Sequence, residues 1–140
     1  MRLKFAIALF FLSIDLLAPD DNSVIIPVPI EINPWQDLWE ATCMVESENN
    51  PSKINFLEGA YGIVQIRKCK LDDFNKATSK KYSISTVLSE SVSREIFMHH
   101  CSECNSIEEA ARKWNGGPKG MTKPQTKDYW KRIRIVLENR

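Results

Sequence analysis

The sequence predicts a mainly α domain (α+β) with a small β element, and three observations support this. Several segments repeat apolar residues at the spacing of one helix face. Residues that start helices precede these segments, and glycines or prolines follow some of them. Between the helical patterns lies a Gly-rich stretch, 59–66, whose β-branched residues indicate a hairpin or small sheet. A chain of 140 residues suffices for one domain with one hydrophobic core.

The first helix is expected to begin after Asn33. Asn33 is a good N-cap, Pro34 suits the first helical position, and Gln36 has the spacing of a capping box. The residues that recur at helical spacing are Trp35, Leu38, Trp39, Thr42, Cys43 and Glu46. Asn49-Asn50-Pro51 is expected to end the helix. This places Glu46 in the last turn, on a largely apolar face.

The later helices are predicted from the same signals. After the Gly-rich stretch we expect helices over 71–77 and 91–104. Ser106 and Glu109 have the spacing of a second capping box, which opens a helix that ends at Asn115-Gly116-Gly117-Pro118. The last helix is expected from about Pro124 to Leu137. The small sheet is expected beside the functional site.

Residues 1–18 are typical of an export signal. Arg2 and Lys4 precede an apolar run over 5–14, which is shorter than the roughly 20 residues that a membrane-spanning helix needs. No clear cleavage site follows, and a buried N-terminal helix is the alternative interpretation. We therefore expect an exported protein, located in the periplasm or outside the cell.

Residues 19–32 are expected to form an extended arm. This stretch contains Pro27 and Pro29 and shows no helical period. No internal repeat or low-complexity tract follows it, so residues 33–140 are expected to form one domain.

Charge excludes one large class of function. The chain carries 19 basic and 18 acidic residues, a formal net charge of +1. A nucleic-acid binder normally has a strong positive excess, so no nucleic-acid partner is expected. A largely uncharged polymer such as a glycan remains compatible with this balance.

The cysteines fit an exported protein, in which disulfides persist. The four are Cys43, Cys69, Cys101 and Cys104, and the sequence does not choose among their three complete pairings. Cys101-x-x-Cys104 follows His99-His100, a pattern that also occurs in zinc and redox sites. The irregular spacing of the other two cysteines and the lack of a βαβ pattern argue against both, and no metal site is expected.

Glu46 is the candidate catalytic residue. Its apolar helix face disfavours the charged form by desolvation, and the negative end of the helix dipole adds to this. A carboxyl group with a raised pKa is what a general acid for glycosidic bond cleavage requires. By itself Glu46-Ser47 is also a common ending for a solvated helix, so the assignment depends on its surroundings.

Four blocks together resemble the catalytic domain of the soluble lytic transglycosylases, relatives of goose-type lysozyme. Glu46-Ser47 is the first block, and Gly59-Ala60-Tyr61-Gly62-Ile63-Val64-Gln65 is similar to the family's Gly-Ala-x-Gly-Leu-Met-Gln. Ala111-Arg112-Lys113-Trp114-Asn115-Gly116-Gly117-Pro118 is similar to Ala-Tyr-Asn-x-Gly-Pro, and Thr126-Lys127-Asp128-Tyr129-Trp130 to Thr-x-x-Tyr-Val. The resemblance covers about residues 35–137. It implies a lysozyme-like fold.

The resemblance also implies a set of residues that contact substrate, beside the catalytic Glu46. They are Ser47, Asn55, Tyr61, Gln65, Trp114, Asn115 and Tyr129. Trp114 replaces the family's tyrosine, and Asn55 replaces a serine that contacts the acid. For several of these residues a role in turns or core packing is the alternative. No metal or organic cofactor is implied.

The implied activity is cleavage of peptidoglycan strands. Glu46 would protonate the bond between N-acetylmuramic acid and N-acetylglucosamine, assisted by the substrate's acetamido oxygen. The same carboxylate would then accept the proton of the 6-hydroxyl, which closes a 1,6-anhydro ring. Service to a secretion or conjugation machine, by opening the wall locally, is an alternative to wall turnover.

Two other functions stay open from the residues. A lysozyme-type hydrolase needs a second carboxyl group, for which the nearest candidates in the sequence are Glu48, Glu58, Asp72 and Asp73. Glu58 lies just before the Gly-rich stretch and stays a candidate. Glu48 lies two residues from Glu46 and would point to another helix face. An inactive glycan-binding or assembly module is the third option, because Val64, Trp114 and Asn55 depart from the family's pattern.

Overall fold

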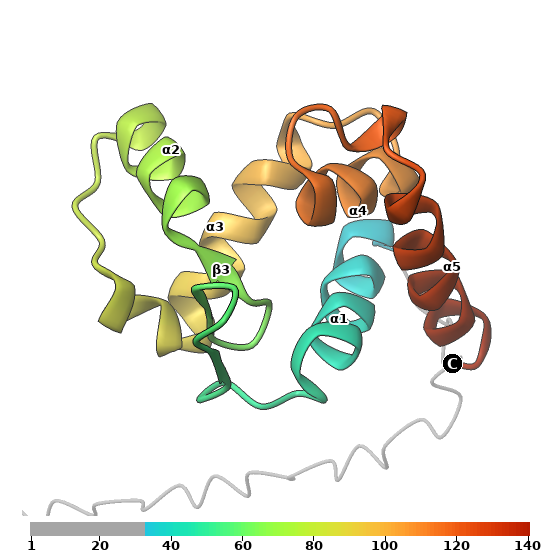
Figure 1. Ribbon diagram of the computed structural model, residues 1–140, viewed down its shortest axis with the longest axis horizontal. Coiled ribbons are helices and arrows are strands. Elements are labelled where there is room, and N and C mark those ends of the chain that lie inside the picture. Colours follow the sequence, from blue (N-terminus) through green and yellow to red (C-terminus); the bar gives the residue numbers. More distant parts are fainter. Residues whose placement is uncertain (1–32) are drawn as a thin grey trace, which may run out of the picture. The chain divides into compact units, whose positions relative to one another are not determined.

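The computed structural model describes residues 33–140, which contain five α-helices and one small sheet (Figure 1). The predictions for residues 1–18 and 19–32 lie outside the described residues. The helices are α1 (Pro34–Ser47), α2 (Lys68–Thr78), α3 (Glu90–Ser102), α4 (Ile107–Gly116) and α5 (Gln125–Glu138), with short 3-10 helices η1 (Ile84–Leu88) and η2 (Gly120–Thr122). The mainly α architecture with a small β element is confirmed.

Helix α1 begins and ends close to where the sequence predicted. The Asn33 side chain accepts a hydrogen bond from the backbone N–H of Trp35 at 3.1 Å. The predicted capping box does not form, because the Gln36 side chain bonds Glu40 and Arg94 and so does not reach back to Asn33. At the other end Glu48 and Asn49 both adopt the left-handed conformation, with φ of 57° and 62°. This reversal turns the chain out of the helix directly after Ser47.

The sheet has three two-residue strands in the order β1 (Ile54–Asn55), β2 (Ala60–Tyr61) and β3 (Ile66–Arg67). Both pairs are antiparallel, with Tyr61 opposite Ile54 on one side and opposite Ile66 on the other. The Gly-rich stretch supplies β2 and the turn into β3, as predicted. Strand β1 was not predicted, because two residues are too few to show an alternating pattern.

The remaining helices match the predicted ones, with shifted ends. Helix α2 begins at Lys68, directly after β3, and is longer than the predicted 71–77. Helix α3 ends two residues before the predicted end. The Ser106 hydroxyl accepts from the backbone N–H of Glu109 at 3.1 Å, as in a capping box. The Glu109 carboxylate, however, accepts from the backbone N–H of Asn105 and not from that of Ser106.

Helix α1 lies at the centre of the packing, in contact with α3, α4 and α5. An aromatic chain joins three of these helices: Trp39 packs edge-on against Phe97 at 5.5 Å, and Phe97 against Trp114 at 4.8 Å. Such edge-to-face pairs stabilise beyond their buried area, by roughly 0.5–1.5 kcal/mol each. The core therefore holds α1 against α4. Each of these helices carries one of the segments from which the sequence predicts the functional site, Glu46-Ser47 on α1 and 111–118 at the end of α4.

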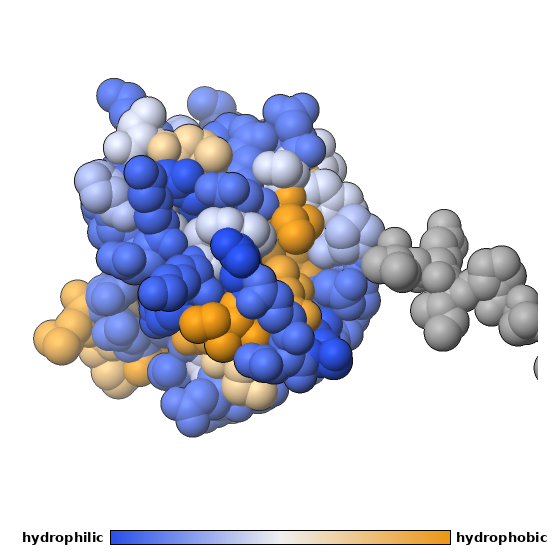
Figure 2. Space-filling view, turned by 90° about the vertical axis from the view of Figure 1, so that its right-hand side faces the viewer, coloured by the Kyte–Doolittle hydropathy of each residue, from blue (hydrophilic) through white to orange (hydrophobic). Residues whose placement is uncertain are grey.

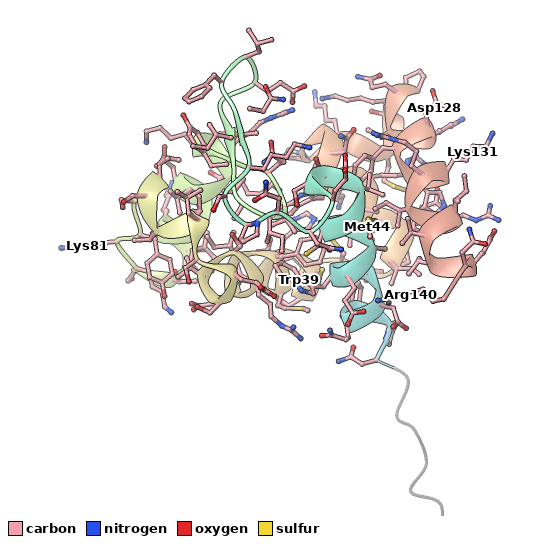
Figure 3. All side chains as sticks on the ribbon, turned by 90° about the horizontal axis from the view of Figure 1, so that it is seen from below. Trp39, Met44, Lys81, Asp128, Lys131 and Arg140 are labelled. Carbon is pink, nitrogen blue, oxygen red and sulfur yellow. The ribbon has the colours of Figure 1, made fainter. Side chains whose placement is uncertain are left out.

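The two ends of the described chain meet. Arg140 pairs with Asp37 at 3.1 Å and also with Glu40, both on α1 (Figure 3). The face on the α5 side is mostly hydrophilic and broken by apolar groups (Figure 2). Within residues 33–140 no helix has the length and apolar character needed to cross a membrane.

None of the four cysteines forms a disulfide. Cys43 and Cys101 are buried, Cys104 is half-buried and Cys69 is exposed, and all four are free thiols. Burial raises the pKa of the Cys43 and Cys101 thiols to about 12, so both stay protonated near neutral pH. The two buried cysteines act as core residues.

Candidate active site

A cleft with a volume of about 660 Å³ opens where the end of α1, the sheet, the start of α2, the end of α4 and helix α5 come together. Five of the residues singled out from the sequence line it: Glu46, Asn55, Gln65, Trp114 and Asn115. Ser47, Tyr61 and Tyr129 do not. The fold therefore gathers most of the predicted site around Glu46, from segments that are far apart in the sequence.

Glu46 lies in the wall of this cleft, in the last turn of α1. Its side chain is largely shielded from water by the protein, and this desolvation raises its pKa above the usual value. The hydroxyl of Tyr129 and the guanidinium groups of Arg132 and Arg67 oppose the shift. Burial is the larger effect, so Glu46 holds its proton to higher pH than an exposed glutamate does.

Tyr129, on α5, lies behind Glu46. Its side chain is only 2% exposed. Among the described residues its hydroxyl is the only buried side-chain polar atom without a hydrogen bond of good geometry. Burial raises the pKa of Tyr129, and the nearby Glu46 carboxyl group raises it further; the Tyr129 hydroxyl in turn lowers the pKa of Glu46. A buried donor without a full partner, beside an acid, is arranged to bond that acid when it becomes charged.

Ser47 ties the helix end to the turn between β2 and β3. Its buried hydroxyl donates to the carbonyl oxygen of Ile63 at 2.7 Å and accepts from the backbone N–H of Asn50 at 3.1 Å. Ser47 does not line the cleft, so the structure gives no support to the expected contact of Ser47 with substrate. Its hydroxyl is consumed by the backbone, and the residue positions Glu46 relative to the turn.

Only a glycine fits at position 62, where the turn between β2 and β3 passes close to the backbone of η1. Its φ is +79°, and a Cβ atom there would lie 2.4 Å from the carbonyl oxygen of Val87. Its N–H donates to the Lys53 carbonyl oxygen at 2.8 Å. A side chain is excluded both by the backbone conformation and by this close approach.

Four residues with amide side chains line the cleft, Asn55, Gln65, Asn115 and Gln125, and two of them are placed differently toward a ligand. Both amide hydrogens of Gln65 go to backbone oxygens, those of Gly62 at 2.8 Å and Lys53 at 3.2 Å. Its carbonyl oxygen makes no hydrogen bond with the described residues, so toward a ligand Gln65 is an acceptor only. The Asn115 amide makes no side-chain hydrogen bond within residues 33–140, which leaves both its donors and its acceptor for substrate.

The sheet contributes one polar wall. The Asn55 side chain lines the cleft while its oxygen accepts from the backbone N–H of Glu58 at 3.2 Å. Among the described residues Glu58 is the one other carboxylate that lines the cleft, and it is paired with Arg67 at 2.5 Å. Tyr61 is half-buried at the centre of the sheet and packs against the core, so its expected contact with substrate is not supported.

Trp114 has a different role from the one expected. Its ring is only 6% exposed, and its indole N–H donates to the carbonyl oxygen of Val64 at 3.0 Å. The ammonium group of Lys70 lies over the ring, 4.5 Å from its centroid. One face of the ring is thus covered by a cation. The ring lines the cleft, but little of it is free to pack against a sugar.

The sequence reasoning missed the cations of the cleft. They are Lys53, Arg67, Lys70, Lys123 and Arg132. They come from four stretches of a chain whose total charge is close to zero, so the charge count does not reveal them. Arg67 and Lys70 belong to one short basic run, Arg67-Lys68-Cys69-Lys70, which by itself does not show that the other three cations lie near it. Only the fold brings them together.

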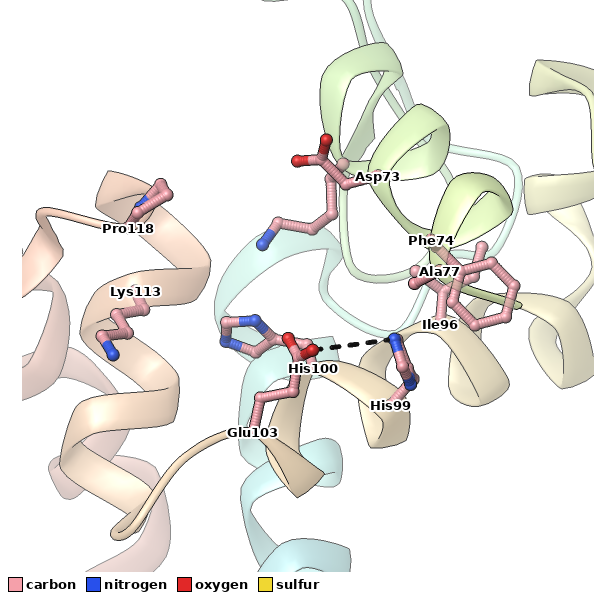
Figure 4. A pocket seen from close by; sticks show the side chains of 10 residues that line it. Asp73, Phe74, Ala77, Ile96, His99, His100, Glu103, Lys113 and Pro118 are labelled. Atoms are coloured by element: carbon pink, nitrogen blue, oxygen red, sulfur yellow. Dashed lines mark ion pairs between the residues drawn. The ribbon is translucent and has the colours of Figure 1, made fainter. Parts of the chain in front are cut away.

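A second cavity, of about 340 Å³, lies among α2, α3 and α4 (Figure 4). His99 and Glu103 lie 4.0 Å apart at its edge. His100 contacts the carbonyl oxygen of Ala110 through Nε2 at 2.9 Å, which requires the proton on that nitrogen. Burial and the nearby Lys70 ammonium lower the pKa of His100 to about 4. Lys70 lines both cavities, so the two meet at its side chain.

Within residues 33–140 no group of three or more His, Cys, Asp or Glu side chains is placed to hold a metal ion. Comparisons of the chain with protein-family models, with curated proteins and with solved structures gave no match. The function must therefore be inferred from the site itself: one partly buried acid with a raised pKa, a tyrosine behind it, and several amide and cationic side chains around an open cleft.

Proposed function

We propose that residues 33–140 form a lysozyme-like lytic transglycosylase domain that cleaves peptidoglycan strands between N-acetylmuramic acid and N-acetylglucosamine. The observation that carries the proposal is Glu46, a largely buried carboxyl group with a raised pKa in the wall of an open cleft. A cleft that is open to solvent suits a polymer better than a closed pocket does, because a strand must pass through it.

The first step is proton delivery. Glu46 gives its proton to the glycosidic oxygen while the bond from the muramic acid C1 to that oxygen breaks. The acetamido oxygen of the same sugar supports the developing positive charge at C1. Tyr129, Arg132 and Arg67 each favour the charged form of Glu46, so they stabilise the carboxylate that this step leaves.

The second step returns the proton. The Glu46 carboxylate accepts the proton of the sugar's 6-hydroxyl, and the 6-oxygen bonds to C1. Glu46 ends protonated as it began, no water is consumed, and the product carries a 1,6-anhydro ring. A residue that is first acid and then base needs burial and stabilising partners in balance, and Glu46 has both.

Glu58 favours one alternative, a lysozyme-type hydrolase with two carboxyl groups. It lines the same cleft and slightly raises the pKa of Glu46. Its ion pair with Arg67 argues against a nucleophilic role, because the paired oxygen is already occupied. We therefore assign Glu58 to the cleft wall.

The products decide between these reactions. Purified sacculi treated with the protein should release muropeptides that end in 1,6-anhydromuramic acid, one water lighter than reducing ends, by mass spectrometry. Reducing ends alone would establish a hydrolase. Strand binding without any released product, under conditions where a related active enzyme works, would leave a glycan-binding module. Export, and service to wall turnover or to a secretion or conjugation machine, are part of the proposal.

A further inference from the structure

The cleft carries far more positive charge than the chain as a whole. Five basic residues line it, and within residues 33–140 the carboxylates that line it with them are Glu46, whose pKa is raised, and Glu58. Asp73 and Glu103 face Lys70 from the second cavity. The complete chain has a formal net charge of only +1. Charges of one sign in a cleft with low-dielectric walls concentrate their field there and attract ligands of the opposite sign.

Three of these cations are already engaged. Arg67 pairs with Glu58. Lys53 donates to the Glu46 carbonyl oxygen at 2.9 Å, and Lys123 to the Gly116 carbonyl oxygen at 2.6 Å. Both lysines therefore hold backbone in place as well as contributing charge.

Lys70 and Arg132 are different. Neither makes a hydrogen bond or an ion pair with any residue of 33–140, although each lies over an aromatic ring, Lys70 over Trp114 and Arg132 over Tyr129. The Lys70 ammonium is also largely shielded from water, and this burial lowers its pKa. Asp73 and Glu103 partly offset this effect from the side of the second cavity, but neither forms an ion pair with Lys70. A shielded cation without a directly paired anion is unfavourable, so a ligand that supplied a carboxylate would relieve that cost.

We propose that the cleft selects glycan strands whose carboxyl groups are free and charged, with Lys70 and Arg132 as their counter-ions. This inference rests on the proposed function and narrows its substrate class. Peptidoglycan offers such carboxylates in two places: on the lactyl group of muramic acid when the peptide has been removed, and on the peptide when it is present. A neutral glycan strand offers none.

Binding tests this without any chemistry. The protein with Glu46→Gln is titrated with soluble strands, either with their peptides or freed of them, each before and after conversion of the carboxyl groups to amides. We expect amidation to weaken binding about 5-fold or more, and the difference to shrink as salt is raised from low to high. The strand form that loses more affinity on amidation identifies which carboxylate is bound.

Lys70→Gln in the same background should lose most of the preference for charged strands, and Lys70→Arg should keep it. Lys76→Gln is the matched control, because Lys76 lies on the same helix, is exposed and lines neither cavity. Circular dichroism melts verify the fold of each variant. Equal affinity for charged and amidated strands would overturn the inference, as would an equal loss in Lys76→Gln. Absence of anhydro products from the unsubstituted protein would instead count against the proposed function, whatever the charge preference.

Discussion

The hydroxyl of Tyr129 is buried close enough to the carboxyl group of Glu46 to lower the pKa of that group, although it makes no hydrogen bond within residues 33–140. Tyr129 comes from α5 and Glu46 from α1, two helices that pack directly on each other. Because a tyrosine hydroxyl can donate to a carboxylate, this contact favours the charged form of Glu46 while burial favours the neutral one. The balance sets the pH at which Glu46 changes from acid to base.

Removal of the Tyr129 hydroxyl should therefore move the pH profile. With Tyr129→Phe the pKa of Glu46 rises further, since a group that lowers it is gone while burial remains. Activity that needs protonated Glu46 falls as pH rises through this pKa, so the alkaline limb should shift to higher pH. The measurement is the rate of anhydro product release against pH for both proteins.

A structural role alone would reduce the rate at every pH and leave the limb where it was. Tyr82→Phe is the control. Its hydroxyl bonds Glu95 at 2.8 Å, away from the cleft, and its loss should leave the limb unmoved. An unshifted limb in folded Tyr129→Phe would count against the coupling of the two residues.

Glu46→Gln should abolish wall-degrading activity while the fold survives. The amide keeps the shape but cannot deliver a proton. General acid–base help is worth roughly 10²–10⁴-fold, and a residue that acts in both steps should lie at or beyond the upper end. Release of soluble muropeptides measures the loss.

The two matched variants are Glu48→Gln and Glu58→Gln. Glu48 is exposed and lies outside the cleft, so its change should have almost no effect. Glu58→Gln breaks an exposed ion pair with Arg67 and should keep most of the activity. A collapse in Glu58→Gln as deep as in Glu46→Gln would point to the two-carboxylate hydrolase.

How much of this the sequence predicted differs between fold and site. The helices were predictable because each has an apolar face, and two of them, α1 and α4, also begin at a side-chain cap, Asn33 and Ser106, as expected. The placement of Glu46 at a helix end beside a Gly-rich turn also followed from local pattern. Contacts between residues far apart in the sequence could not be predicted in this way. A local pattern does not show, for example, that Tyr129 lies close to Glu46.

The sequence also did not predict how the polar groups of three site residues are used within the fold. Ser47 and Trp114 have polar groups that suit a sugar, but the fold gives those groups to the backbone oxygens of Ile63 and Val64. Gln65 keeps only its acceptor. A polar residue beside an acid is ambiguous until its own hydrogen bonds are known, and those depend on tertiary packing.

Two buried groups should pull the stability in opposite directions on the acid side. Glu46 has a folded pKa above its usual 4.5, so its contribution is fully present below 4.5 and is lost as pH rises through the folded value. His100 has a folded pKa of about 4 against 6.5, so its contribution is present above 6.5 and is lost as pH falls toward 4. Their windows overlap.

Substitution of one of these two groups should therefore reveal how the other makes the free energy of unfolding depend on pH. In Glu46→Gln the free energy of unfolding at neutral pH should exceed that of the unsubstituted protein, and the gap should close below pH 4.5. The Glu46→Gln protein should still lose up to about 3 kcal/mol between pH 6.5 and 4 because of His100. Addition of His100→Gln should flatten that loss. Urea titrations across this range measure both effects, and an unchanged slope in the double variant would contradict the assignment to His100.

Gly62→Ala should be far more damaging than Gly59→Ala. Both glycines have positive φ, +79° and +59°, so either alanine costs about 1–2 kcal/mol in the backbone alone. At Gly59 nothing lies within 4 Å of a new Cβ, whereas at Gly62 it would meet the Val87 carbonyl oxygen at 2.4 Å. We expect an additional loss of at least about 2 kcal/mol for Gly62→Ala, measured by urea unfolding. Equal losses would mean that η1 moves away freely.

The role of Ser47 separates positioning from binding. Ser47→Ala leaves the Ile63 carbonyl oxygen without its buried hydrogen-bond donor, which should cost about 1–3 kcal/mol of stability, whereas the Asn50 N–H keeps its bond to the Ser47 backbone oxygen. Because the hydroxyl does not face the cleft, affinity for strands should change little. Asn115→Ala is the contrasting variant: its amide lines the cleft and bonds nothing else described, so it should weaken binding with little effect on unfolding. Strand titrations in the Glu46→Gln background and urea unfolding measure the two quantities. A stable Ser47→Ala protein with strongly weakened binding would restore Ser47 to the substrate contacts that the sequence predicted.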